Sequence, residues 1–185
     1  MTTFFTEAAT LIIEVVFGLY ILAVLLRFLF QLVRADFYNP ISQFLVALTN
    51  PLLKPLRRVI PGLLGIDFAS LVLLLALQFL EFYVLSWLSG LTTGFIPLLL
   101  AAVLSLVRLT IKVYFFATVL RVILSWFMPY GMRQNPAGDL LVSLTEPLMR
   151  PARRLIPAVG GLDLSPIAVI VGLQIMLLAV DYLPR

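Results

Sequence analysis

Long apolar runs constrain the fold of this chain more than any other feature of its sequence. Residues 71–80 read LVLLLALQFL, and residues 167–180 read IAVIVGLQIMLLAV. A helix needs about 20 largely apolar residues to cross the hydrocarbon core of a bilayer. Only 12% of the residues are charged, which is about half the share typical of a soluble domain. The sequence therefore predicts an all-α integral membrane protein.

Four membrane-spanning helices are predicted, at residues 10–33, 68–89, 97–127 and 164–183. The third is long for one crossing, because about 30 helical residues measure about 45 Å against a hydrocarbon core of about 30 Å. We expect its first turns to tilt or to lie in the interface. No Lys or Arg precedes the first apolar run, although a cleaved signal peptide opens with a positive region. We therefore expect the first span to be retained.

The second half of the chain repeats the first. The phrase NPLLKPLRRVIP at residues 50–61 returns as EPLMRPARRLIP at residues 146–157. Matching residues lie 94 positions apart up to Arg27 and Arg121, and 96 positions apart from Asn39 and Asn135 onward. We predict two tandem repeats, residues 1–92 and 93–185, that form one membrane-embedded unit. Two spans per copy give both copies the same orientation, which makes the repeats parallel.

The distribution of cations predicts the topology. Each of the loops 34–66 and 128–162 holds four Lys or Arg residues, whereas residues 90–95 and the first ten residues hold none. Cytoplasmic loops carry the excess of cations in membrane proteins, so both repeated loops should be cytoplasmic and both termini outside. The net charge of +4 suits contact with anionic lipid. Because most cations lie beside spans, we expect no nucleic-acid partner.

A short amphipathic helix is predicted at the start of each cytoplasmic loop, where apolar residues recur at helical spacing. Asn39 and Asn135 are suitable caps, each followed by proline as the first helical residue. Such a helix is too short to span a bilayer, so it should lie in the interface. Its apolar residues are Ile41, Phe44, Leu45 and Leu48 in the first copy, and Ala137, Leu140, Leu141 and Leu144 in the second.

Two prolines follow in each copy, Pro51 and Pro55 and then Pro147 and Pro151. Each removes a backbone donor and obstructs the preceding turn, so we expect the helix to break into short turns that hold the cations near lipid headgroups. Arginine can donate two hydrogen bonds at once to a phosphate. Two interpretations are open, an anionic-lipid or phosphate site built twice, or an anchor that only fixes topology. The candidate binding residues are Lys54, Arg57, Arg58, Arg150, Arg153 and Arg154.

Asp67 and Asp163 stand where the second and fourth spans begin. A carboxylate at this position accepts backbone N–H groups and matches the positive end of the helix. We interpret both residues as helix caps, with a salt link to the nearby arginines as the alternative.

This doubled pattern resembles the YggT family of bacterial membrane proteins. The resemblance rests on NP, then P-L-x-[KR]-P-x-R-R-x-I-P, then G-[IL]-D, in both copies, and it covers nearly the whole chain. It implies an inner-membrane protein that acts in osmotic-stress tolerance and potassium homeostasis. Links of the wider family to envelope and division functions, and to cytochrome maturation in plastids, imply a scaffold or assembly factor as the alternative. The resemblance supplies no catalytic residues.

Polar residues inside the spans are costly in lipid and are candidates for function. Arg27 and Arg121 lie near the cytoplasmic ends, where snorkelling would explain them. A glutamine halfway along the second and fourth spans could join the two copies or line a polar path. Glu14 falls opposite Arg108 in the repeat, so we predict an intramembrane pair, with separate contacts to the outer interface as the alternative. The candidate cluster is Glu14, Gln78, Glu81, Arg108, Lys112 and Gln174.

Composition narrows the function classes. The chain has no cysteine and no histidine, so we expect no disulfide, no zinc site of the usual kind and no haem ligation, and hence no metal or cofactor. No nucleophile, base and orienting partner occur together, so we expect a protein that is not an enzyme. Ion transport and a scaffold role remain open, with anionic lipid, a second copy or another membrane protein as partners.

Overall fold

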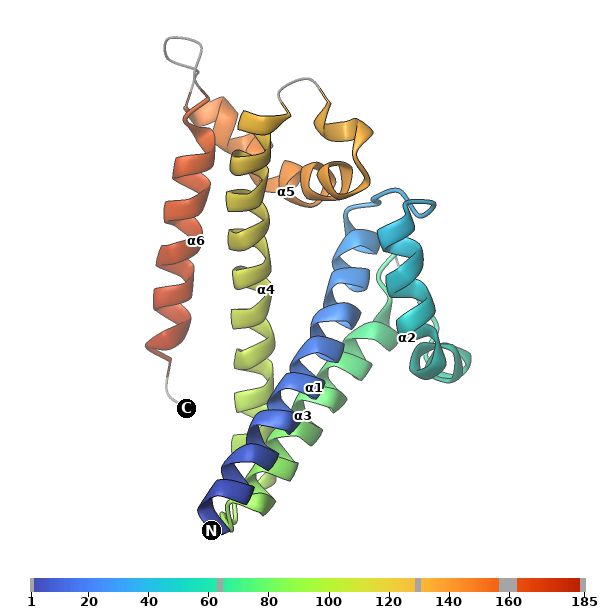
Figure 1. Ribbon diagram of the computed structural model, residues 1–185, viewed down its shortest axis with the longest axis vertical. Helices are drawn as coiled ribbons and strands as arrows, with labels where there is room; N and C mark the ends of the chain where they lie inside the picture. Colours follow the sequence, from blue (N-terminus) through green and yellow to red (C-terminus); the bar gives the residue numbers. More distant parts are fainter. Residues whose placement is uncertain (1, 63–64, 129–130, 157–162, 184–185) are drawn as a thin grey trace. The chain divides into compact units, whose positions relative to one another are not determined.

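The computed structural model describes residues 2–62, 65–128, 131–156 and 163–183, and the regular structure of these residues is helical (Figure 1). Three of the helices, α1, α3 and α4, are long and apolar enough to cross a membrane, and α6 is apolar but shorter. The chain is a multi-pass membrane protein, and the all-helical prediction is confirmed. The elements are α1 (Thr2–Leu32), α2 (Pro40–Val59), α3 (Phe68–Leu88), α4 (Phe95–Phe127), η1 (Met132–Gln134), α5 (Pro136–Leu155) and α6 (Ser165–Asp181).

The ends of these helices differ from the predicted spans in two places. α1 begins at Thr2 and has 31 residues, so it extends well before the predicted start at residue 10. α6 has 17 residues and measures about 26 Å, slightly less than the hydrocarbon core of a typical bilayer. α4 has 33 residues, so the predicted long third helix is a single continuous element.

The prediction that the prolines break the chain into short turns is wrong. α2 and α5 each run for 20 residues through both of their prolines, and Figure 1 shows α2 changing direction along its length. All four prolines are exposed, whereas Leu53 and Met149, on the opposite side of their helices, are buried. The lost backbone bonds therefore lie on the open side of each helix. Packing on the other side keeps the helix continuous and leaves a bend.

Caps and a close backbone contact fix the start of α5. The Asn135 side chain accepts hydrogen bonds from the backbone N–H groups of Ala137 and Gly138. Gly138 packs so tightly on η1 that a Cβ atom there would stand 2.2 Å from the carbonyl oxygen of Met132. The matching cap Asn39 accepts from the N–H of Ile41 and donates its amide to the Pro136 carbonyl, at 2.8 Å. The two loop helices are thus joined at their starts.

Contacts group the chain into two compact units that do not coincide with the sequence repeats. The first unit holds the residues up to Phe28 together with Leu45–Val107, and the second holds Leu29–Phe44 together with the residues from Arg108 on. The boundaries fall inside α1, α2 and α4. Each unit therefore combines helical segments that lie far apart in the sequence.

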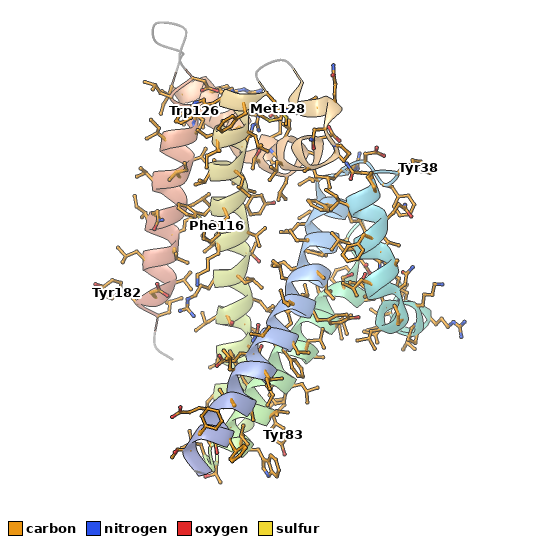
Figure 2. All side chains as sticks on the ribbon, viewed as in Figure 1. Tyr38, Tyr83, Phe116, Trp126, Met128 and Tyr182 are labelled. Carbon is orange, nitrogen blue, oxygen red and sulfur yellow. The ribbon has the colours of Figure 1, made fainter. Side chains whose placement is uncertain are left out.

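Each unit has its own apolar core. In the first unit the buried side chains include Val24 of α1, Leu53 of α2 and Leu74 of α3. In the second unit, Ile111 of α4, Met149 of α5 and the residues Val169 and Leu173 of α6 form one buried cluster. α5 thereby covers one end of α4 and α6. In Figure 2, Trp126 lies at this end of α4 and Tyr182 at the far end of α6, as expected for aromatic residues at the two membrane–water interfaces.

Candidate functional site

An arginine–aspartate pair closes the loop after α2, and an equivalent pair closes the loop after α5. Arg57 is hydrogen-bonded to Asp67, and the Nε atom of Arg153 donates to Asp163 at 3.0 Å. Each aspartate also accepts from a serine of the following helix, Ser70 in the first copy and Ser165 in the second. The two aspartates therefore bind both the start of the next helix and the basic phrase.

Electrostatics keep these aspartates ionised. Burial by itself raises the pKa of Asp67, but hydrogen bonds from Arg57 and Ser70 outweigh it and hold the pKa below its ordinary value. The same balance, with Ser165 and Arg153 as donors, lowers the pKa of Asp163. Asp67 is 5% exposed and Asp163 is 42% exposed. The first pair is therefore better shielded from solvent.

A second arginine in each copy reaches from a transmembrane helix to the middle of the loop helix. Nη1 of Arg27 donates to the Thr49 hydroxyl at 2.6 Å, and Nη1 of Arg121 donates to the Thr145 hydroxyl at 2.8 Å. Each threonine hydroxyl in turn donates to the carbonyl one helical turn earlier, of Leu45 or Leu141. Both threonines are fully buried. We call these two places the Arg27 site and the Arg121 site.

The two sites differ in the residue that follows the threonine. In the Arg121 site this residue is Glu146, which accepts from Nη2 of Arg121 at 3.0 Å and from Nη1 of Arg153 at 3.2 Å. Burial raises the pKa of Glu146, but these arginines outweigh it and lower the pKa overall. In the Arg27 site the residue is Asn50, whose side-chain oxygen accepts from Nη1 of Arg27 at 3.0 Å. One site has an internal counterion and the other has a neutral amide.

A cavity of about 490 Å³ opens beside the Arg121 site, between α4, α5 and α6. Three arginines line it, and Glu146, Asp139 and Asp163 pair with them. Such a cleft can hold an anionic or hydroxylated group, but its cations are already largely neutralised. The ionic and aromatic lining residues are Arg121, Trp126, Arg133, Arg153 and Asp163.

The predicted lipid-binding cations fall into two groups. Arg57 and Arg153 belong to the aspartate pairs, and Arg150 lies 3.5 Å from Glu146. The other three are exposed and form no ion pair with any residue that the structure describes. They are Lys54, Arg58 and Arg154.

The predicted intramembrane residues are also distributed over separate places. Gln78 donates to Glu81 at 2.7 Å and both are buried, whereas Glu14 is exposed on α1. In the second unit, Nε of Arg108 donates to Asp181 at 2.7 Å. The predicted pair of Glu14 with Arg108 would join the two units and stays a prediction. Lys112 and Gln174 are exposed on α4 and α6.

Sequence reasoning missed Asp181 and the threonines. Counted from the ends that α5 covers, Arg108 lies 19 residues into α4 and Asp181 lies 16 residues into α6, which correspond to similar depths of about 25–30 Å. Counting depth in this way could have paired them. Thr49 and Thr145 match at the offset of 96, so closer comparison of the two copies could have found the Arg27 and Arg121 sites.

Two membrane-spanning repeats with the same arginine contacts define a duplicated multi-pass membrane protein. The chain belongs to the CCB3/YggT family, which matches residues 6–88 and again residues 100–183. It is 47% identical to an uncharacterised protein of Pseudomonas aeruginosa over 171 residues, covering 91% of this chain and 86% of the relative. An uncharacterised protein of Vibrio alginolyticus is 40% identical, with coverage of 91% and 90%.

The uncharacterised protein YggT of Escherichia coli K12 is 37% identical over 168 residues, covering 90% of this chain and 86% of the relative. No solved structure matches the chain. The predicted resemblance to the YggT family, with two tandem repeats, is confirmed by these matches.

Proposed function

We propose that the chain crosses the bacterial inner membrane four times as two parallel repeats, with α2 and α5 in the cytoplasmic interface and their cations against anionic lipid. The role is not enzymatic, and it serves osmotic-stress tolerance and potassium homeostasis. This setting is what the resemblance described above implies, and the relatives that match the chain are themselves uncharacterised. The observation that best supports the lipid contact is the surface of α2.

α2 has three distinct faces. One face is buried and carries Leu45, Thr49 and Leu53. A second, next to it, is apolar but exposed, and the exposed cations occupy the third. An exposed apolar stripe beside cations is the pattern of a helix that lies in the headgroup region of a bilayer. The exposed stripe consists of Ile41, Phe44, Leu48, Leu52 and Val59.

α5 supports the same orientation less strongly. Leu140 and Leu144, which match Phe44 and Leu48 of α2, are buried, whereas Leu155 is 82% exposed. α5 therefore offers lipid only its last turn, and α2 carries most of the proposed contact.

Lipid retained through purification tests this proposal. Lys54→Gln, Arg58→Gln and Arg154→Gln, combined, remove those cations of the two basic phrases that form no ion pair with any described residue, so no ion pair of the fold is broken. We expect the ratio of anionic to zwitterionic phospholipid that copurifies with the protein to fall. Lys112→Gln is the matched control, because it removes an exposed cation from a transmembrane helix. An unchanged ratio in the triple variant would leave only the topology anchor.

Potassium flux into liposomes that contain only this protein tests the homeostatic role. Saturable flux would support transport by the protein itself. Absence of flux would favour the scaffold.

Gln174 favours the scaffold or assembly role as a second candidate. It is exposed near the middle of α6, among exposed Val171, Ile175 and Leu178. An amide in hydrocarbon gains about 1 kcal/mol from a partner on another helix. A photo-crosslinker in place of Gln174 should capture a membrane protein or a second copy, and a crosslinker in place of Leu100 on α4 is the control. Labelling of lipid alone at both positions would contradict this role.

A further inference from the structure

The Arg27 and Arg121 sites are built alike but are neutralised differently. In both, an arginine of a transmembrane helix bonds a buried threonine of a loop helix. In both, a second arginine, Arg57 or Arg153, bonds the aspartate before the next helix. Because the geometry is shared, the residue after the threonine is the main chemical difference.

In the Arg121 site, Glu146 bridges the two arginines. One carboxylate oxygen accepts from Arg121 and the other accepts from Arg153. A bridging carboxylate both neutralises charge and satisfies donors on two guanidinium groups. The second copy therefore carries its own anion between its arginines.

In the Arg27 site, no carboxylate among the described residues bonds Arg27. Its Nη1 atom donates to Thr49, to Asn50 and, at 3.4 Å, to the Val46 carbonyl, all of them neutral acceptors. Arg27 is only 8% exposed. The carboxylate of Asp67 bonds Arg57 instead. A charge buried without a bonded counterion is costly.

We infer that the first copy binds the phosphate group of an external anion beside Asn50, where it bridges Arg27 and Arg57 as the Glu146 carboxylate bridges Arg121 and Arg153 in the second copy. A phosphate has the oxygens to accept from both guanidinium groups, and bidentate pairing with arginine is its preferred recognition. The difference between Asn50 and Glu146 thus leaves one phosphate site in a duplicated protein.

The exposure of Arg57 and the position of Arg27 along α1 both fit a phospholipid as the source of the phosphate group. Arg27 lies five residues before the end of α1 at Leu32, about 8 Å along the helix axis, and Arg57 is 37% exposed. A headgroup in the same leaflet as α2 can reach this position. Free inorganic phosphate offers the same chemistry. The choice of lipid rests on the proposed function, whereas the site itself does not.

Introducing a negative charge at residue 50 tests this inference. In the full-length protein, Asn50→Glu places a carboxylate between the arginines, and Asn50→Gln is the control of similar size without charge. We expect native mass spectrometry to show one phosphatidylglycerol retained tightly by the wild type and by Asn50→Gln. Asn50→Glu should weaken that retention by at least about tenfold, because two or more charge-assisted bonds are lost. It should also raise the Tm in lipid-free detergent, because Arg27 gains a counterion.

Glu146→Asn is the reciprocal variant and should create a second tightly bound lipid. Titration with inorganic phosphate in lipid-free detergent distinguishes the source. If phosphate binds with the same pattern across the variants while no lipid is retained, the site takes free phosphate. If neither probe responds to Asn50→Glu, the inference is overturned. The proposed lipid contact fails separately, through an unchanged lipid ratio in the Lys54, Arg58 and Arg154 triple variant.

Discussion

Asp67 and Asp163 both bond an arginine and a serine, but only Asp67 is the N-cap of its helix, because α6 has Leu164 at that position. Asp163 is also more exposed, so we expect unequal effects of substitution. Asp67→Ala removes a helix cap and the partner of Arg57, so we expect the free energy of unfolding to fall by about 1–3 kcal/mol. Asp163→Ala should cost about 1 kcal/mol or less, because its pair is solvated. Thermal unfolding in detergent measures both. Asp67→Asn keeps the cap and separates the two contributions. Equal losses at the two positions would contradict this account.

The lowered pKa values of three carboxylates predict how the stability of the protein changes at acid pH. The pKa values of Asp67, Glu146 and Asp163 are below their ordinary values in the folded protein. Their stabilisation is therefore complete above the ordinary carboxyl pKa, about 4, and it is lost as the pH falls through the lower folded values. We expect the Tm to decline below about pH 4. In Asp67→Asn this decline should be shallower, and an unaltered slope would show that Asp67 does not contribute.

Gly138 is the residue whose substitution should be most damaging for its size. A Cβ atom would collide with the Met132 carbonyl, which is backbone and cannot easily move. We expect Gly138→Ala to lower the stability by about 1–3 kcal/mol, as overpacking does. Gly172→Ala is the control, because a Cβ there meets nothing within 4 Å. That variant should be neutral or stabilising by up to about 1 kcal/mol.

Between elements, the pair of Arg108 and Asp181 should hold α4 to α6. Arg108→Ala and Asp181→Ala should each lower the stability by up to about 1 kcal/mol, as partly exposed pairs do. The charge-swapped variant Arg108→Asp with Asp181→Arg should recover much of the loss, as measured by Tm in detergent.

The swap of Glu14→Arg with Arg108→Glu tests the partner predicted from the repeat. Rescue by this swap alone would assign Arg108 to Glu14. Rescue by the Asp181 swap alone would assign it to α6.

The helices show which parts of the fold can be predicted from the sequence. Hydropathy predicts α1, α3, α4 and α6 because each is an apolar helix of at least 17 residues, and spacing predicts the starts of α2 and α5 through Asn39 and Asn135. It failed at the prolines, because whether a proline ends a helix depends on what packs on the opposite side. Leu53 and Met149 are ordinary apolar residues in the sequence, and only the tertiary fold shows that they are buried.

For the whole molecule, the testable feature is topology. We expect reporters inserted at residues 90–94 and at the C-terminus to read as external, because both basic loops should be cytoplasmic. A reporter in the loop after α2 should read as internal and serves as the control. A cytoplasmic C-terminus would mean that α6, which is the shortest of the apolar helices, does not cross the membrane.

The candidate sites were predictable to a lesser degree than the helices. The doubled basic phrase points to the loops that hold the two sites, and Arg27 and Arg121 match at the offset of 94. Their partners were not predicted, because Thr49 and Thr145 stand out only when the two copies are compared residue by residue. The difference between Asn50 and Glu146 is visible in the sequence, but its meaning depends on which guanidinium groups meet there.

The bends in α2 and α5 have a consequence for how deeply these helices can sink. A proline leaves the carbonyl four residues earlier without its helical donor, so Ala47 and Pro51 in α2, and Ser143 and Pro147 in α5, each present an oxygen that must find another. Hydrocarbon supplies no donor, and an unsatisfied carbonyl there costs several kcal/mol. The two helices can therefore enter the bilayer only as far as those oxygens still contact water in the headgroup region. The prolines thereby limit how deeply each helix can enter the bilayer, and the neighbouring cations stay at the depth of the lipid phosphates.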